Sequence, residues 1–384
     1  MKPSHRSIRR LPLLAAACAL APALLRAQLP APAVSARAPV HVGAYGSVAL
    51  RHAVRSDSAA GTGLNEAAAA LLISGTLGKL SYFGEIEAAS VTRENWTGRE
   101  DQRWVEVERA YGEYAPYDAL RIRAGRFLTP IGQWNETHGA PLTWTAGRPL
   151  TSYRPFAKST TGLMAAGQLP VGPRDAGYAL WVAPFDFEPR GEGEENTFVR
   201  AAGGRVAIEV APDLYLGASA AGFRATRRAG ETEPDDDGDD DRTALPGRRP
   251  GAVHRQTGDD GGDGEPEDAL EEDATARTLL GADLSWRYRG FQLLSEAAWV
   301  SAADTLPAER GAFVQAAVPL VRGVHATGRF EVYDPVVTGP LRIWTAGLNW
   351  RPDPRLTLKA ERQATDRPSR RVVDGWLVSL SVLF

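Results

Sequence analysis

Charged side chains set at alternate positions in otherwise apolar stretches are the features of this 384-residue sequence that could do chemistry. In an extended strand, residues two positions apart project from the same face, so two like charges with that spacing form a short row. Rows of opposite sign across an aqueous space create a field that acts on ions, whereas rows in contact form ion pairs that brace a wall. The sequence leaves both interpretations open. The three rows are Glu85 with Glu87, Glu106 with Glu108, and Arg121 with Arg123. They fall on three successive predicted strands, of which the first and the last flank the middle one, so we expect the rows to lie across from one another.

The same alternation predicts the polar face of later segments. In residues 323–333, Arg329 and Glu331 alternate with Phe330 and Val332. If such segments cross a bilayer, an arginine or lysine facing lipid at mid-depth costs about 2–4 kcal/mol, so the charged set must face a lumen. We expect this lumen to hold water rather than a packed core. Its further lining residues are predicted to be Arg205, Glu209, Asp283, Arg287, Glu296, Arg329, Glu331, Lys359 and Glu361.

Residue patterns that do covalent or redox chemistry are absent. The sequence contains no G-x-S-x-G, H-E-x-x-H or P-loop motif and no dinucleotide-binding fingerprint. The five histidines after residue 27 are scattered, and no Ser/His or Asp/His set can be assembled from them. We predict that the protein is not an enzyme, that it binds no cofactor, and that nucleic acid is not a partner.

The N-terminus has the three parts of a secretory signal. Basic residues precede an apolar run from Leu11 to Leu25, and a cleavage site falls before Gln28, which defines a signal peptide at 1–27. The apolar run is shorter than the roughly 20 residues that a spanning helix needs, and no later segment reaches that length without charges. The sequence therefore excludes a helical membrane protein and predicts export.

The exported chain is expected to form one domain. After a short lead at 28–39, the domain runs over residues 40–384. The only cysteine, Cys18, lies in the signal, so the exported chain carries no disulfide and no thiolate metal site.

Runs of period-2 alternation recur along the whole domain. Each is about nine to twelve residues long, which matches a tilted strand crossing a bilayer. The number is even, as expected for a bacterial single-chain barrel. The sixteen predicted strands are 40–50, 67–77, 80–91, 103–114, 119–128, 161–169, 176–187, 198–210, 213–224, 276–288, 291–301, 310–319, 323–333, 341–350, 355–363 and 373–384.

The connections between these strands alternate in length. Short ones carry turn residues, as in Gly78-Lys79 and Arg289-Gly290. With both termini in the periplasm, every short turn would lie on the periplasmic side and every long loop outside, which is typical of outer-membrane barrels. The long connections are 51–66, 92–102, 128–160, 188–197, 225–275 and 364–372.

Two strands illustrate the strength and the weakness of the pattern. In 373–384, Trp376, Val378 and Phe384 share one face with other apolar residues, and the opposite face carries serines. Strand 103–114 fits poorly, because its charged residues fall on both faces; we expect a bulge there or a different register. The fold class is predicted as an all-β transmembrane antiparallel barrel of about 16 strands, with a long third extracellular loop and an acidic fifth loop.

Residues 120–138 carry the most distinctive motif. Gly125-Arg126-Phe127 ends a strand and runs through Thr129-Pro130 into a tryptophan-rich loop. Over residues 104–160 the chain resembles the outer-membrane porin superfamily, and particularly the branch grouped with the phosphate-selective porins. The resemblance implies a homotrimer and a third extracellular loop that folds into the barrel. Phosphate-selective members carry an arginine ladder and a lysine cluster, but only three lysines follow the signal here, so phosphate specificity is not predicted.

Residues 128–160 are the candidate constriction loop. An ordinary surface loop is the alternative, but the apolar side chains of Trp134, Leu142, Trp144, Tyr153 and Phe156 favour burial. Together with the lumen residues named above, the site residues predicted at this constriction are Arg126, Trp134, Glu136 and His138.

The acidic segment 225–275 stands apart in composition. Between residues 230 and 275 it contains 17 Asp and Glu against four Arg. A solvated extracellular loop is the better interpretation, because the EF-hand spacing fails. It could gather cations or recruit divalent ions that bridge lipopolysaccharide. The weak calcium candidates are Asp235, Asp237, Asp239 and Asp241.

These observations favour a porin of the bacterial outer membrane, a passive channel for small hydrophilic or ionic solutes in contact with membrane lipid and lipopolysaccharide. The alternative is a barrel with a closed lumen that acts as a surface-interaction or structural protein through its acidic loop. A TonB-dependent transporter is excluded by length, since it needs about 22 strands and a plug.

Overall fold

The protein forms a closed antiparallel β-barrel in which each strand pairs with the next and β16 closes on β1. The computed structural model describes residues 40–55, 62–95, 98–152, 154–184, 196–227, 275–303, 307–334, 339–367 and 374–384, and the predicted signal and nearly all of the acidic segment lie outside these ranges. Sixteen strands lie within the described residues, and they confirm the predicted order. They are β1 His41–Arg55, β2 Thr62–Leu77, β3 Leu80–Asn95, β4 Gly98–Tyr117, β5 Leu120–Leu128, β6 Ser159–Val171, β7 Arg174–Ala183, β8 Asn196–Ala211, β9 Leu214–Arg227, β10 Thr275–Tyr288, β11 Phe291–Val300, β12 Glu309–Val321, β13 Val324–Asp334, β14 Leu341–Asp353, β15 Leu356–Thr365 and β16 Asp374–Leu383.

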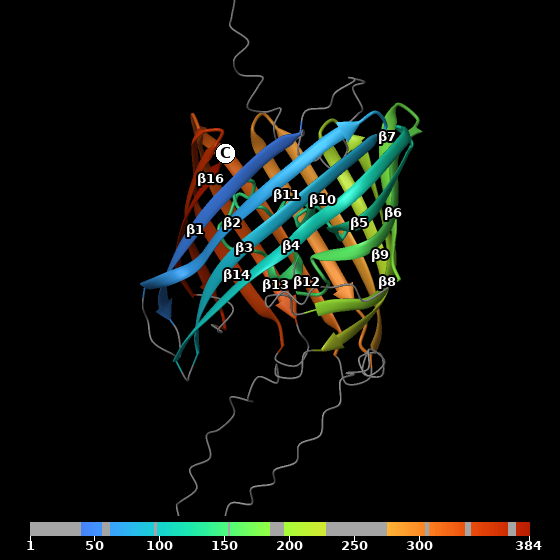
Figure 1. Ribbon diagram of the computed structural model, residues 1–384. Helices are drawn as coiled ribbons and strands as arrows, with labels where there is room; N and C mark the ends of the chain where they lie inside the picture. The colour runs from blue at the N-terminus through green and yellow to red at the C-terminus, as the bar shows by residue number, and fades with distance from the viewer. Residues whose placement is uncertain are drawn as a thin grey trace, which may run out of the picture.

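The two ends of the barrel differ in their connections. At one end, here called the short-turn end, pairs of strands are joined by only two residues, as between β2 and β3 or between β12 and β13. The C-terminus lies at this end, at the top of Figure 1. The opposite end, here called the long-loop end, carries the longer connections. The connection predicted at 92–102 is shorter than expected, because β3 continues to Asn95 and β4 begins at Gly98.

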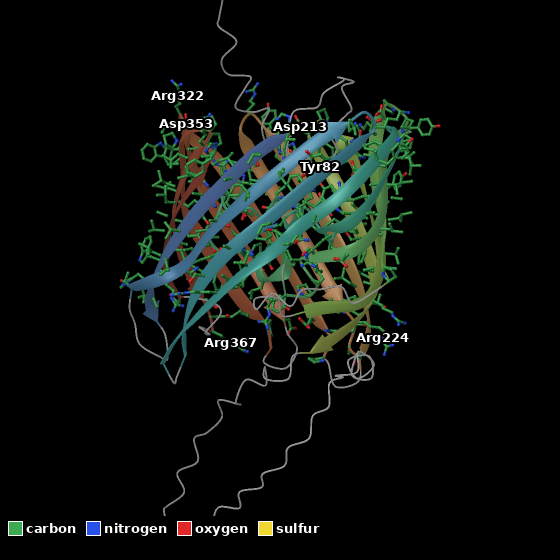
Figure 2. All side chains as sticks on the ribbon, in the orientation of Figure 1. Tyr82, Asp213, Arg224, Arg322, Asp353 and Arg367 are labelled. Atoms are coloured by element: carbon green, nitrogen blue, oxygen red, sulfur yellow. The ribbon has the colours of Figure 1, made fainter. Side chains whose placement is uncertain are left out.

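The outer face of the wall is apolar, as Figure 2 shows for side chains projecting from the barrel. In β16, Trp376 and Val378 are about half exposed, whereas Ser379 and Ser381 point inward and are buried. This confirms the predicted alternation. The same outward row continues on the neighbouring strand, where Leu50 of β1 pairs with Val378. Among the residues that the structure describes, no helix has the length and apolar character needed to cross a membrane.

A β-bulge in β4 explains why this strand fitted the period-2 pattern poorly. Ile86 of β3 pairs with Val107, but the residue before it, Glu85, pairs with Arg109. Glu108 of β4 is therefore an extra residue that has no partner on β3. A bulge of this kind reverses the alternation beyond it. Glu106 and Glu108 therefore face inward before the bulge, and Arg109 and Glu113 face inward after it.

Gly125 makes a second break in the alternation, at the motif that carried the porin resemblance. Its φ is +124°, which side chains rarely adopt, and a Cβ there would lie 2.2 Å from the carbonyl oxygen of Ala110. Beyond it, Arg126 and Phe127 are consecutive and both buried. The glycine thus turns the end of β5 into the barrel, where the chain enters the loop of residues 129–158.

A dry cluster fills part of the lumen, and this corrects the expectation of a lumen that holds only water. Phe127, Ile131 and Phe156 at the base of the loop pack against inward side chains of the wall, among them Trp181 and Phe223. The wall members come from β6 to β11, mostly from the half nearer the long-loop end. Alternation alone did not reveal them, because small or apolar residues occupy both faces of these strands there.

The outer apolar face predicts a depth-dependent cost for charge. Val378→Arg, near the middle of β16, is expected to lower the free energy of unfolding by about 2–4 kcal/mol, because a charge at the bilayer midplane loses its hydration. Val321→Arg, the same change at a strand end beside a turn, is expected to cost about 0–1 kcal/mol. Denaturant unfolding from lipid vesicles, followed by tryptophan fluorescence, measures both; equal costs would contradict the assignment of this face to lipid.

Candidate functional site

The loop of residues 129–158 crosses the inside of the barrel. It leaves β5 and returns to β6 at one base, where the Thr129 N–H donates to the carbonyl of Lys158 at 2.9 Å. The loop contains two short 3-10 helices, η1 Asn135–Thr137 and η2 Leu150–Ser152, and the wall of strands encloses them (Figure 1). The loop is irregular, so its backbone groups need partners other than a strand.

Three glutamates on alternate strands supply acceptors for those backbone donors. Glu296 of β11 accepts from the N–H groups of Gln133 and Trp134, and its second oxygen accepts from the Ser152 hydroxyl at 3.0 Å. Glu331 of β13 accepts from both the N–H and the hydroxyl of Thr151, at 2.8 and 2.9 Å. These carboxylates hold the loop against the far wall.

The third glutamate, Glu361 of β15, uses its two oxygens separately. One accepts from the N–H of Ala146 and the other from the N–H of Gly147, each at 2.8 Å. Each oxygen therefore accepts from one of two adjacent backbone groups of the loop.

Cationic side chains of the same wall bind the loop's carbonyls. Lys359 donates to the carbonyl of Ala140 at 2.8 Å, and Arg329 donates to the carbonyl of Gly147 at 2.7 Å. Arg351 donates to the carbonyl of Leu142 at 3.1 Å and lies over the ring of Trp144. Arg329, Glu331 and Lys359 face inward as predicted, but they contact the loop.

Arg351 was missed by the sequence reasoning. It was assigned to a turn, whereas β14 continues to Asp353, so the inward row that contains Asn349 extends to it. The signal that could have found it was this continued alternation through Trp350, which points outward.

The opposite side of the loop contacts β4. His138 lies with Nε2 2.5 Å from Glu108 Oε1, while Nδ1 lies 2.6 Å from the carbonyl oxygen of Asn135. Lys158 pairs with Glu106 at 2.8 Å. The loop therefore brings a histidine and a lysine to the acids of this part of the wall.

The register corrects the predicted facing of charge rows. Glu87 pairs across the strands with Glu106, but Arg123 pairs with Glu113, and Nη2 of Arg123 lies 2.7 Å from that carboxylate. Arg121 pairs with Ala166. The short turn between β4 and β5 is the reason, because it pairs Tyr117 with Leu120 and so places Arg123 opposite Glu113 rather than opposite Glu106. The arginine row and the Glu106 row are thus offset along the wall.

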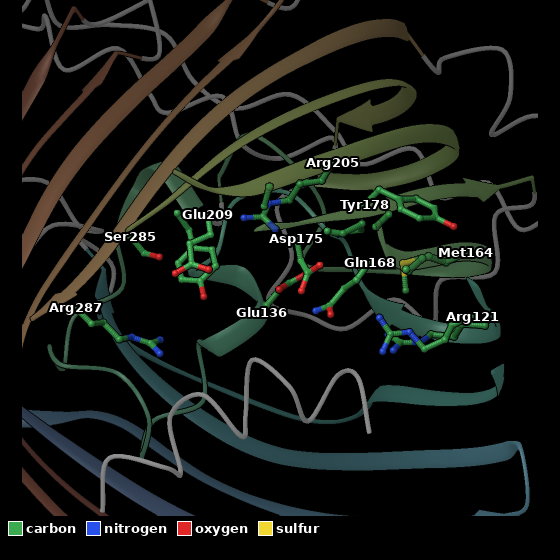
Figure 3. Close-up of a pocket in the computed structure, with 18 residues that line it drawn as sticks. Arg121, Glu136, Met164, Gln168, Asp175, Tyr178, Arg205, Glu209, Ser285 and Arg287 are labelled. Atoms are coloured by element: carbon green, nitrogen blue, oxygen red, sulfur yellow. The ribbon is translucent and has the colours of Figure 1, made fainter. Parts of the chain in front are cut away.

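A cavity of about 320 Å³ lies on the side of the loop that faces the short-turn end (Figure 3). It is bounded by the loop at Pro130 and Glu136 and by strands β5 to β10. Six residues predicted to lie in the lumen or at its constriction line this cavity, namely Arg121, Arg123, Glu136, Arg205, Glu209 and Arg287, and they are joined by Gln168, Asp175 and Ser285.

The charges of the cavity are partly neutralised. Arg205 donates from two nitrogens to Asp283, at 2.7 and 3.2 Å. Arg123 likewise donates from two nitrogens to Glu113, at 2.7 and 3.0 Å. Enclosure in the lumen raises the pKa of the Glu136 carboxyl, although the positive charges of Arg205 and Arg123 oppose that shift. The cavity is therefore lined by charged groups of both signs and by small apolar side chains.

The remaining predicted residues lie away from this cavity. Trp134 and Arg126 are buried at the base of the loop, and Glu85 and Glu87 lie on β3, where they contact Arg109 and the Tyr45 hydroxyl. Tyr153 lies outside the described residues, as do the calcium candidates Asp235, Asp237, Asp239 and Asp241. Within the described ranges, no group of three or more His, Cys, Asp or Glu residues could hold a metal ion.

Comparison with known proteins shows similarity at the level of fold. No family model and no curated protein matches this sequence. Among solved structures, OmpF of Salmonella typhi, in complex with daunomycin, is 10% identical with a TM-score of 0.56, and the match covers 90% of this chain and 97% of that one. The outer membrane channel DcaP of Acinetobacter baumannii is 10% identical with a TM-score of 0.53, over 93% and 100% of the chains. An anion-selective porin from Comamonas acidovorans is 12% identical with a TM-score of 0.53, over 90% and 98%.

These similarities establish that the chain shares the sixteen-stranded barrel fold of outer-membrane porins. They do not single out the phosphate-selective branch.

The bonds to Glu361 predict how firmly the loop is held. Glu361→Gln replaces one acceptor by an amide that points a donor at a backbone N–H, so a buried donor loses its partner, at a cost of about 1–3 kcal/mol. Hydrogen exchange at Ala146 and Gly147 is expected to become about tenfold to a hundredfold faster, measured by mass spectrometry.

The matched control for that change is Glu309→Gln. Glu309 contacts Arg277 and Tyr333, whereas Ala146 and Gly147 donate to Glu361, so exchange at these two loop residues should stay as in the parent protein. Unchanged exchange in the Glu361 variant would mean that this carboxylate does not hold the loop.

Proposed function

We propose that the protein is a porin of the bacterial outer membrane, which passes small hydrophilic or ionic solutes passively down their gradients. The observation that carries the proposal is the polar, charged cavity inside a barrel whose outer face is apolar. A water-accessible interior and a lipid-compatible exterior are the two requirements of such a channel.

The loop of residues 129–158 is the constriction in this proposal. It divides the lumen, and solutes pass on the side of the cavity, where Glu136 of the loop faces arginines of the wall such as Arg121 and Arg287 (Figure 3). Fixed charges in a narrow aqueous space select ions by the field they create. The arginines support a preference for anions, which is also the selectivity named for the Comamonas porin.

The proposal includes contact of the barrel with membrane lipid and lipopolysaccharide, and assembly of three copies of the chain into a homotrimer. The porin fold supports them, and a trimer form is named for OmpT of Vibrio cholerae, whose barrel has a TM-score of 0.53 to this one. Export after cleavage of the signal at 1–27 belongs to the same proposal.

Conductance in a planar bilayer tests the function directly. The refolded protein is expected to give stable steps, with a reversal potential under a KCl gradient that has the sign for anions. Arg287→Gln should reduce this anion preference, because Arg287 lines the cavity, whereas Arg322→Gln, in an exposed turn at the same end, should not. A folded, heat-modifiable barrel that stays electrically silent would contradict the porin proposal and favour the alternative of a closed surface-interaction barrel.

A disulfide between loop and wall tests whether the constriction is fixed. A Cβ added at Gly311 of β12 would lie 3.2 Å from Cβ of Thr151, somewhat closer than the separation of about 3.5–4.5 Å usual in a disulfide, and 2.8 Å from the ring of Tyr333. The loop, the strand and this ring must therefore move apart for the bond to form. With Thr151→Cys and Gly311→Cys combined, we expect equal conductance before and after reduction, because the loop already occupies its working position. Conductance that appears only on reduction would mean that the loop must move to open the channel. Each single cysteine variant serves as the control.

A further inference from the structure

Arg121 is a buried cation to which no carboxylate of the described wall is hydrogen-bonded, although the charges of Glu113 and Asp118 act on it from a distance. Its side chain projects into the lumen from the second residue of β5 and is only 7% exposed. Its Nε and Nη2 atoms have no hydrogen-bond partner among the described residues. A buried charged group left unpaired is costly, so such a group points to an anion that completes it.

The neighbouring arginines show the contrast. Arg123, two residues along β5, donates from Nε and Nη2 to Glu113. Arg205, on β8, is bound in the same two-nitrogen manner to Asp283. In Arg121 the same planar pair of donors has no carboxylate of the protein as its partner, and the side chain lines the cavity.

The wall beside Arg121 leaves room for a ligand. Along the strand pairing, Arg121 is followed by Ala166 on β6, Ala179 on β7 and then Arg205 on β8. All four line the cavity. With adjacent strands about 4.8 Å apart, two alanines in succession form a shallow apolar bay roughly 10 Å wide between the two arginines.

The residues around this bay favour one class of anion. Met164, Ala166 and Pro130 offer apolar surface in the cavity that Arg121 lines. Glu136 and Asp175 line the same cavity, so a compact dianion such as phosphate meets carboxylates as well as arginine. A carboxylate carries a single charge, matches the planar donor pair, and can bring an apolar body to the alanines.

The geometry points to a binding subsite for small organic carboxylates with a compact apolar body, in which the carboxylate pairs with Arg121 and the body lies over Ala166 and Ala179. This subsite deepens the proposed function and rests on it in one respect, that solutes reach the cavity through the lumen.

Titration with 4-fluorobenzoate, followed by fluorine NMR in an uncharged detergent, tests the subsite. Arg121→Gln is expected to weaken binding about tenfold or more, because one charge-assisted donor pair is lost. Arg322→Gln removes the same charge from an exposed turn at the same end of the barrel and should leave the affinity unchanged. Equal affinity in all three proteins would overturn the assignment of Arg121.

A second variant keeps the cation and fills the bay. Ala179→Leu should also weaken 4-fluorobenzoate binding, since the added side chain occupies the space of the ring, and heat-modifiable migration confirms that each variant is folded. Inorganic phosphate should compete only weakly; phosphate that binds as tightly as benzoate would replace the carboxylate class by general oxyanion binding and overturn the proposal. If the protein binds 4-fluorobenzoate but does not conduct, the channel proposal is wrong and the subsite stands. If it conducts but does not bind 4-fluorobenzoate, the subsite is wrong and the channel proposal stands.

Discussion

Backbone hydrogen bonding inside the barrel is the constraint on which the rest of the structure depends. A segment without regular secondary structure can lie at membrane depth only if protein or water satisfies its N–H and C=O groups. Here Glu296, Glu331 and Glu361 accept from the loop's N–H groups, while Lys359 and Arg351 donate to its carbonyls. Charged wall residues therefore define where the loop lies, and the position of the loop defines which part of the lumen remains open.

The loop divides the lumen into two environments. Against β6 to β11, at the half nearer the long-loop end, it packs through Ile131 and Phe156 into a dry cluster. Towards the short-turn end the same strands carry Arg205, Glu209 and Arg287, and the cavity lies there. One set of strands thus provides apolar contact in one half and ionic groups in the other. This division places the cavity on the side of the loop that faces the short-turn end.

The sequence predicted the barrel well because each strand's period-2 pattern is a local property. The lipid-facing row of Trp376 and Val378 and the inward row of Arg329 and Glu331 could be assigned without any knowledge of neighbouring strands. The partners of inward charges could not, because they depend on register and on the loop. Glu108 meets His138, thirty positions away, and nothing in local spacing indicates that contact.

The dry cluster was missed for a related reason. Phe127 and Phe223 are inward residues that a lipid-facing assignment would have suited equally well, and in the structure they pack in one cluster with Ile131 of the loop. The composition of a strand therefore identifies the face that contacts lipid more readily than it identifies an inward apolar face that a loop covers.

The two breaks in alternation lie close together, and this has a structural logic. The bulge at Glu108 in β4 makes Glu108 and Arg109 both available to the lumen, and Gly125 in β5 does the same for Arg126 and Phe127. A regular strand offers one inward residue in two, which is too sparse to hold an irregular loop where it enters the barrel. Each break raises that density locally, on the two strands next to the point where the loop begins. An interruption of period 2 in a strand that precedes a long loop therefore indicates that the loop is anchored inside the barrel, and in this chain the glycine of the Gly125-Arg126-Phe127 motif has that structural role.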